Sequence, residues 1–203
     1  ASMFKAIEEV LCGRAEGVLS CGNTGSLMAA GTLKLRSLAG IERPALATVW
    51  PTQNEHFILL DAGANPETKP IQFLHNALLG KAYARVVLQK PQPRIGLLTI
   101  GTEEGKGTET ILKAHHYLQQ ARPTLNYIGP IEGFQLFNNT CDVVGCDGLT
   151  GNIGLKVGEG LFSTLKGYLK TEIKKNWIRM LGAFLTQGAF LSLKRQLNPE
   201  NYG

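Results

Sequence analysis

Short apolar runs, each followed by a glycine-rich turn and then by a helix-like segment, recur along the chain. Ile58–Leu60 and Ile95–Leu98 contain no polar residue, as in strands that are covered on both faces. The pattern predicts an α/β fold with a mostly parallel sheet and helices on both faces. The expected strands are Gly17–Cys21, Ala45–Trp50, Phe57–Asp61, Arg94–Ile100, Asn126–Ile128 and Asp142–Cys146.

Helical patterns lie between these strands. Side chains from Ile71 to Arg85 recur close to the roughly 3.6-residue period of a helix, which predicts a helix over 70–88. The turn Gly129–Gly133 is expected to end the short strand before it. Other helices are expected after Gly25 to about Leu38, after Gly107 to about Gln120, and from about Gly154 onward.

Right-handed crossovers bring the loops that follow parallel strands to one edge of a sheet, where ligands bind in open α/β folds. Four loops are expected to meet there: Gly22–Gly25, Ala62–Thr68, Gly101–Gly107 and Asp147–Asn152. Glycines allow close backbone approach and helix N-termini supply N–H donors, so the edge is suited to a phosphate or an oxyanion. Each loop alone is more commonly an ordinary turn, and Asp147 would equally cap the next helix.

The positive charge of the chain is concentrated in one segment. The net charge is +5, and residues 166–195 hold seven basic side chains against the single acidic Glu172. The remainder is therefore close to neutral, which argues against a nucleic-acid-binding core and for a local acidic partner or surface.

The same basic segment carries an apolar stripe. Gly182 and Gly188 interrupt its helical pattern, so two short helices joined near Gly188 are expected. The stripe suits a packing or dimer face, an interfacial helix on anionic lipid, or a docking surface for an acidic protein. Its apolar members are Trp177, Met180, Leu181, Phe184, Leu185 and Leu191, and its flanking cations include Lys174, Lys175 and Arg179.

The cysteines and histidines indicate no metal site. Cys141 and Cys146 lack zinc-knuckle spacing and have no histidine nearby. No signal peptide is recognisable, and no apolar run approaches the roughly 18 residues that span a bilayer. We therefore expect reduced thiols in a cytoplasmic protein. Cys21 and Cys146 are candidates for a catalytic cysteine, but a small buried apolar residue is the favoured interpretation of each. No metal or cofactor is expected.

Six motifs, in order and at matching spacing, resemble the bacterial phosphate acyltransferase (PlsX) family. They are Ser20–Ser26, Gly40–Ala45, Leu60–Asn65, Ile100–Gly107, Cys146–Asn152 and Leu197–Gly203. Two positions depart from the family: Thr102 stands where Glu is usual, and Cys21 where Ala is frequent. The resemblance divides the chain into a core over 1–165 that lacks the family's N-terminal strand, a basic helical hairpin over 166–196, and a truncated return to the core over 197–203.

The resemblance implies a fold like that of phosphate acetyltransferases and of isocitrate or isopropylmalate dehydrogenases. It implies transfer of a fatty acyl group from an acyl carrier protein thioester to inorganic phosphate, which gives acyl phosphate for phospholipid synthesis. It also implies a homodimer, attached peripherally to the inner face of the membrane through the helical hairpin.

Site residues follow from this activity. Lys106 is expected to hold phosphate or the developing oxyanion, Asn152 to donate a neutral hydrogen bond, and Asp147 to orient one of them rather than act as a base. Phosphate is already an anionic nucleophile, so positioning and desolvation matter more than a strong base. The expected substrate-binding residues are Gly22, Asn23, Thr24, Gly25, Asn65, Gly107, Gly148 and Gly151; the expected membrane or partner surface is Lys174, Lys175, Trp177, Arg179, Leu181, Phe184 and Leu185.

Two alternatives remain open at this stage. A dehydrogenase of the related fold would require a carboxylate cluster for a divalent metal and a nicotinamide pocket, and neither is evident in the sequence. A non-catalytic membrane-associated scaffold would retain an anion pocket without the chemistry.

Overall fold

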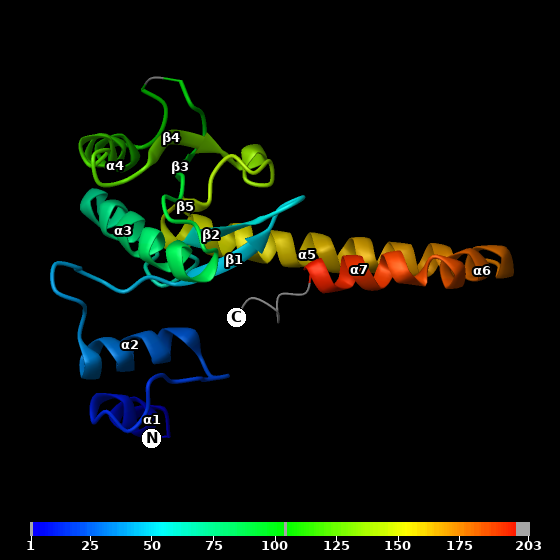
Figure 1. Ribbon diagram of the computed structural model, residues 1–203, viewed down its shortest axis with the longest axis horizontal. Helices are drawn as coiled ribbons and strands as arrows, with labels where there is room; N and C mark the ends of the chain where they lie inside the picture. Colours follow the sequence, from blue (N-terminus) through cyan, green and yellow to red (C-terminus); the bar gives the residue numbers. More distant parts are fainter. Residues whose placement is uncertain (1, 104, 198–203) are drawn as a thin grey trace.

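Five strands form one sheet in the order β1-β2-β5-β3-β4 (Figure 1). The computed structural model describes residues 2–103 and 105–197. Strands β2, β5, β3 and β4 are parallel, whereas β1 pairs with β2 in antiparallel orientation. The predicted mostly parallel sheet is therefore confirmed. The strands span β1 Ala47–Pro51, β2 His56–Leu60, β3 Ile95–Thr99, β4 Tyr127–Glu132 and β5 Val143–Gly145.

Both faces of the sheet are covered. Helices α3 (Pro70–Val87) and α4 (Glu109–Gln120) pack on one face, and the short helix η1 (Gly133–Gln135) and the start of α5 (Gly148–Ile173) cover the other. Side chains alternate along β2, so Ile58 and Leu60 enter the first core and Phe57 and Leu59 the second. Continuous apolar runs are the consequence of this two-sided burial.

Two element boundaries differ from the predictions. β4 continues through the expected turn to Glu132, because Pro130 lies in an edge strand, where its missing N–H costs no ladder bond. Helix α5 begins at Gly148 rather than near Gly154. Asp147 caps it, with Oδ1 accepting a 2.8 Å hydrogen bond from the Thr150 backbone N–H.

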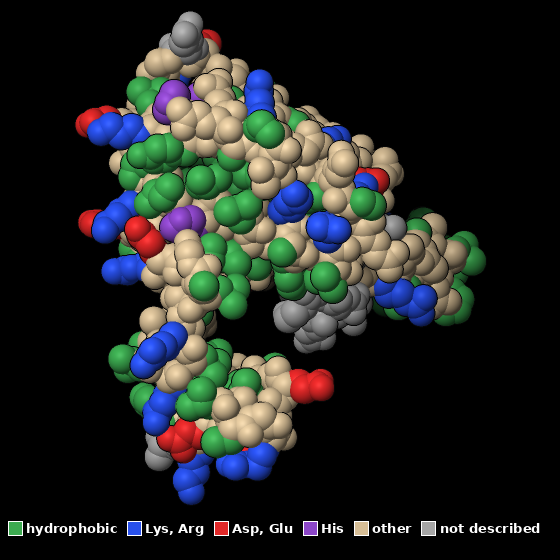
Figure 2. Space-filling view, turned by 60° about the vertical axis from the view of Figure 1, so that its left-hand side comes forward, with side chains coloured by type: hydrophobic (Ala, Val, Ile, Leu, Met, Phe, Trp, Pro, Cys, Tyr) green, Lys and Arg blue, Asp and Glu red, His purple; other side chains and the backbone are tan. Residues whose placement is uncertain are grey.

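The first two helices lie apart from the sheet. α1 (Ser2–Leu11) and α2 (Thr24–Leu35) pack against each other through the buried Ile7 and Ala30. A salt bridge of 2.7 Å from Lys34 to Glu8 joins them. In Figures 1 and 2 this helix pair is connected to the remainder by a narrow neck of chain.

The strand predicted at Gly17–Cys21 is wrong: this stretch is non-regular backbone between α1 and α2. A strand is stabilised by hydrogen bonds to a neighbouring strand. Within residues 2–103 and 105–197, no strand pairs with this stretch.

The last three helices form an arm that extends from the sheet (Figure 1). α5 leads outward, and α6 (Trp177–Leu185) and α7 (Gln187–Leu197) turn back. The predicted pair of short helices is confirmed, with the break at Thr186 instead of Gly188. No described helix is long and apolar enough to cross a membrane. Most of the predicted return over 197–203 lies outside the described residues.

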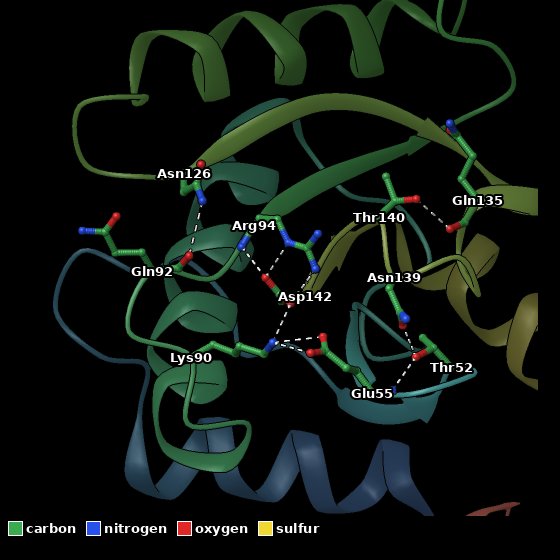
Figure 3. Close-up of polar contacts among 10 residues, drawn as sticks. All are labelled: Thr52, Glu55, Lys90, Gln92, Arg94, Asn126, Gln135, Asn139, Thr140 and Asp142. Carbon is green, nitrogen blue, oxygen red and sulfur yellow. Dashed lines mark hydrogen bonds and ion pairs between the residues drawn. The ribbon is translucent and has the colours of Figure 1, made fainter.

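An ion-pair network joins the amino ends of β3 and β5 (Figure 3). The side chain of Asp142 is 4% exposed and lies 3.1 Å from Nη2 of Arg94 and 3.8 Å from Nζ of Lys90. Lys90 also pairs with Glu55 at 2.9 Å. Burial opposes ionisation of Asp142, but hydrogen bonds from the Arg94 side chain and backbone outweigh it and lower the pKa of the carboxyl.

Candidate functional site

A cavity of about 760 Å³ opens at the carboxyl edge of the sheet, between the first turns of α3 and α4. Its walls come from the loops that follow β2, β3 and β5, as parallel topology requires. The charged lining residues are Arg43, Glu67, Lys69 and Asp147, and the hydroxyl-bearing ones are Thr68, Thr108 and Thr110. Two of the four predicted loops, Ala62–Thr68 and Asp147–Asn152, contribute lining residues, and the lining after β3 begins at Thr108, directly after the predicted Gly101–Gly107 loop. Lys106 and Asn152 are not among the lining residues.

The loop after β2 is organised by a buried carboxylate. Asp61 is fully buried, and its Oδ1 accepts hydrogen bonds from the backbone N–H groups of Leu46, Gly63 and Ala64 at 2.8 to 3.1 Å. Its Oδ2 accepts from both the backbone and the side-chain amide of Asn65, each at 2.8 Å. These five donors fix the conformation of the loop.

Asn65, which was expected to shape the pocket, lies behind the cavity rather than in its lining. It is buried, and its Nδ2 also donates to the carbonyl of Pro44 at 2.8 Å. Its own carbonyl accepts a 3.0 Å hydrogen bond from the Gly148 N–H. Asn65 thus connects the loop before β1 to the first turn of α5.

Gly148 and Gly151 allow α5 to approach that loop closely. A Cβ on Gly148 would lie 2.5 Å from the carbonyl oxygen of Asn65, and one on Gly151 would lie 1.9 Å from that of Asp61. No side chain fits at either position. Both glycines therefore act through helix packing, and they position the residues that follow them on α5.

Asn152 lies against the loop after β2. Its side-chain atoms are 3.3 to 3.6 Å from the place of a Cβ on Gly63, whose φ of +133° favours glycine. Its amide is exposed and forms no hydrogen bond with any described residue. The amide is therefore available to a ligand.

Lys106 lies in the exposed loop between β3 and α4. Its Nζ is 2.8 Å from a carboxylate oxygen of Glu103, and this hydrogen bond raises the pKa of Lys106 and keeps the amine charged. The turn requires glycine at Gly105 and Gly107, where φ is +83° and +115°. Oγ1 of Thr99 lies 3.4 Å from the place of a Cβ on Gly107. This oxygen is buried and has no hydrogen-bond partner in the described part of the chain.

Asp147 lines the cavity, but its oxygens are already engaged. Thr150 donates to both, from its backbone N–H at 2.8 Å and from its Oγ1 at 2.7 Å. The carboxylate therefore holds the first turn of α5, which is the turn that carries Asn152.

The Gly22–Gly25 loop is not brought to this cavity. Asn23 caps α2, with its Oδ1 accepting a 2.9 Å hydrogen bond from the Ser26 N–H. A Cβ on Gly22 would contact Met3 of α1. In Figure 1 this loop and the Gly101–Gly107 loop lie at opposite ends of the view.

The predicted membrane or partner surface lies on the arm and is exposed. Trp177 is 72% exposed, Phe184 64% and Leu185 74%. Glu172 pairs with both Lys175 and Arg179, the latter at 2.6 Å. Leu181 is also exposed, and Lys174 forms no ion pair with any described residue.

Two site residues were missed from the sequence. Arg43 was noted only as part of the motif Gly40–Ala45, and Asp61 only as the end of a strand and as part of the motif Leu60–Asn65. Arg43 reaches the cavity because the chain before β1 runs beside Asn65. A carboxylate directly after an apolar strand, followed by Gly63 and Asn65, was the available signal for Asp61.

The fold is that of the phosphotransacetylases. A phosphotransacetylase from Streptococcus pyogenes superposes with a TM-score of 0.63 at 16% identity, over 79% of this chain and 55% of that chain. The EutD phosphotransacetylase from Staphylococcus aureus gives 0.58 at 17% identity, over 79% and 56%. The predicted fold class is thereby confirmed.

The sequence profile of the "Fatty acid synthesis protein" family matches residues 1–203, and the chain belongs to that family. A phosphate acyltransferase from Halalkalibacterium halodurans is 45% identical over 204 residues, which are 100% of this chain and 60% of that protein. One from Alcanivorax borkumensis is 42% identical over 202 residues, again 100% and 60%. The chain thus spans about 60% of the length of these relatives.

Proposed function

We propose that the carboxyl edge of the sheet transfers an acyl group from a carrier-protein thioester to inorganic phosphate. The observation that carries the proposal is the cavity with Arg43 and Lys69 in its lining, where the loops after β2, β3 and β5 meet. Family membership and relatives named phosphate acyltransferase support it. The names of the structural neighbours favour acyl transfer over dehydrogenation.

The proposed reaction needs few protein groups. An oxygen of hydrogen phosphate attacks the thioester carbon, and the C–S bond breaks as the tetrahedral intermediate collapses. The phosphate proton passes to the departing thiolate, so the products are acyl phosphate and free thiol. The carbonyl oxygen gains negative charge in the transition state, and one well-placed donor there contributes about 3 kcal/mol.

Lys106 and Asn152 are the donors that we assign to this step. The amine of Lys106 is charged, and its ion pair with Glu103 is exposed on both sides and therefore weak, so the amine can leave Glu103 for the substrate. The Asn152 amide has no competing partner among the described residues. Asp147 serves as a positioning residue, because Thr150 occupies its carboxylate.

The acyl carrier protein is proposed as the thioester donor and the anionic membrane surface as the place of action. Exposed Trp177 and Phe184 beside Lys174 suit a helix lying at a lipid interface. The apolar exposed face of α5, which includes Leu161 and Leu165, is proposed as the homodimer face.

Acyl-phosphate formation from acyl carrier protein thioester tests the two donors. Lys106→Ala and Asn152→Ala should each lower kcat/KM about 100-fold. Circular dichroism and a thermal melt should match the parent, since both side chains are exposed. Near-normal activity in either variant would remove that residue from the mechanism.

A further inference from the structure

Two cations on the wall of the cavity support the proposed function, but the transfer step described above gives neither of them a specific contact. Arg43 and Lys69 both line it and both are exposed. Neither forms an ion pair with any residue that the structure describes. Other cations around the sheet, such as Lys90 and Lys106, do have carboxylate partners.

The residues on either side of Arg43 are anchored by three hydrogen bonds, two to backbone atoms and one to a side chain. Oε2 of Glu42 accepts a 3.0 Å hydrogen bond from Nε2 of Gln72, and the Glu42 N–H donates to Nδ1 of His75 at 3.4 Å. The carbonyl of Pro44 accepts from Asn65 at 2.8 Å. Arg43 therefore projects from a segment held between α3 and the loop after β2.

The acidic groups of the lining form no ion pair with either cation in the described part of the chain. Asp147 is engaged by Thr150. Glu67 is the remaining carboxylate of the lining, and it is exposed without a partner among the described residues. The lining thus holds two cations and two carboxylates, and of these four only Asp147 has its charged group engaged by a described side chain. Thr108 and Thr110 add hydroxyl groups to the same lining.

We propose that Arg43 and Lys69 form a subsite for a phosphate group. The guanidinium offers paired N–H donors that match two phosphate oxygens, and the ammonium adds a mobile point charge. Within the proposed function, on which this inference rests, the group is either inorganic phosphate or the phosphodiester of the pantetheine arm that carries the thioester. The two sources share one chemistry and are separable by experiment.

Calorimetric titration of the full chain tests binding without depending on acyl transfer. The probes are inorganic phosphate, phosphopantetheine and pantetheine, each with the parent, Arg43→Gln and Lys69→Gln. Each substitution should raise the Kd of a phosphate-bearing probe about tenfold, through the loss of one charge-assisted contact. Arg85→Gln, an exposed arginine of α3 outside the cavity, should leave every Kd unchanged.

The outcomes identify the source. Weaker binding of inorganic phosphate assigns the subsite to the free anion, and weaker binding of phosphopantetheine but not of pantetheine assigns it to the arm. Glu67→Gln should tighten the same probe, because it removes the carboxylate of the lining that no described residue holds in place. The proposal is overturned if the parent binds neither phosphate-bearing probe, or if Arg43→Gln and Lys69→Gln bind as the parent does.

These results separate the subsite from the transfer reaction. Weakened binding in both variants, together with no acyl-phosphate formation by the parent, would keep the subsite and reject the proposed function. If both variants bind the probes as the parent does and the parent forms acyl phosphate normally, the subsite is rejected and the proposed function is kept.

Discussion

The carbonyl oxygen of Asp61 lies so close to Gly151 that a Cβ on Gly151 would stand 1.9 Å from it. The first turn of α5 therefore packs in close contact with the loop after β2. Hydrogen bonds to the Asp61 carboxylate fix the conformation of that loop. Asp147 and Asn152 belong to the same stretch of chain. The positions of Asp147 and of the assigned donor Asn152 therefore depend on this glycine contact, together with the similar contact of Gly148 with Asn65.

Gly151→Ala should destabilise the chain by about 3 kcal/mol, because the backbone of Asp61 cannot move without breaking its loop. Gly154→Ala is the matched control on the same helix, where no atom lies within 4 Å of the new Cβ. It should stabilise the chain by roughly 0.5 to 1 kcal/mol, through helix propensity. Urea unfolding followed by circular dichroism measures both, and equal stabilities for the two variants would contradict the contact.

Asp142 should make stability sensitive to acid. The pKa of its carboxyl in the folded chain lies below the ordinary value of about 3.9. The stabilisation is therefore complete above that ordinary value and is lost as the pH falls through the folded pKa. At pH 7, Asp142→Asn should cost about 2 to 3 kcal/mol, since the partner Arg94 is partly exposed and solvent screens the pair.

Urea unfolding of the parent and of Asp142→Asn across pH 7 to 3 provides the check. The difference in unfolding free energy should be constant down to about pH 4 and then shrink. A difference that persists unchanged at pH 3 would show that the carboxylate charge is not what joins β3 to β5.

Only two of the four thiols should react in the folded chain. Cys12 and Cys21 are exposed, whereas Cys141 and Cys146 are buried. Burial raises the pKa of Cys141 to about 12 and also raises that of Cys146, so neither forms the reactive thiolate near neutral pH. Titration with an aromatic disulfide reagent should release two equivalents before denaturation and four after. Rapid reaction of a third thiol would place a buried cysteine at the surface.

Vesicle binding should depend on the cations of the arm. Lys174→Glu, Lys175→Glu and Arg179→Glu together should abolish co-flotation with vesicles that contain anionic lipid. A control with Lys5→Glu, Arg85→Glu and Lys113→Glu changes the net charge equally but leaves the arm intact. If the arm variant floats as well as this control, the electrostatic part of the membrane proposal fails.

The sheet was predictable because burial on both faces leaves a strong signal in the sequence. Phe57–Leu60 alternates between two cores and so is apolar at every position. Gly17–Cys21 has a similar local pattern but no neighbouring strand among the described residues. The local sequence of a segment does not show whether another strand is available to pair with it.

The site was predictable only in part. Glycine-rich loops after β2, β3 and β5 indicated the edge at which the cavity lies, because parallel topology determines where such loops meet. Arg43 precedes β1 and reaches the cavity through tertiary hydrogen bonds of Glu42 and Pro44 to residues 21 to 33 positions away. The spacing of residues in the local sequence around Arg43 does not predict such long-range contacts.

The phosphate dependence of thiol release tests the central claim most directly. The full chain is incubated with acyl carrier protein thioester and isotopically labelled inorganic phosphate, and free thiol and labelled acyl phosphate are measured together. We predict that both products appear in equal amounts and that neither forms without phosphate. Thiol release that is independent of phosphate, or that yields free fatty acid instead of labelled acyl phosphate, would contradict a phosphate acyl transfer site at this edge of the sheet.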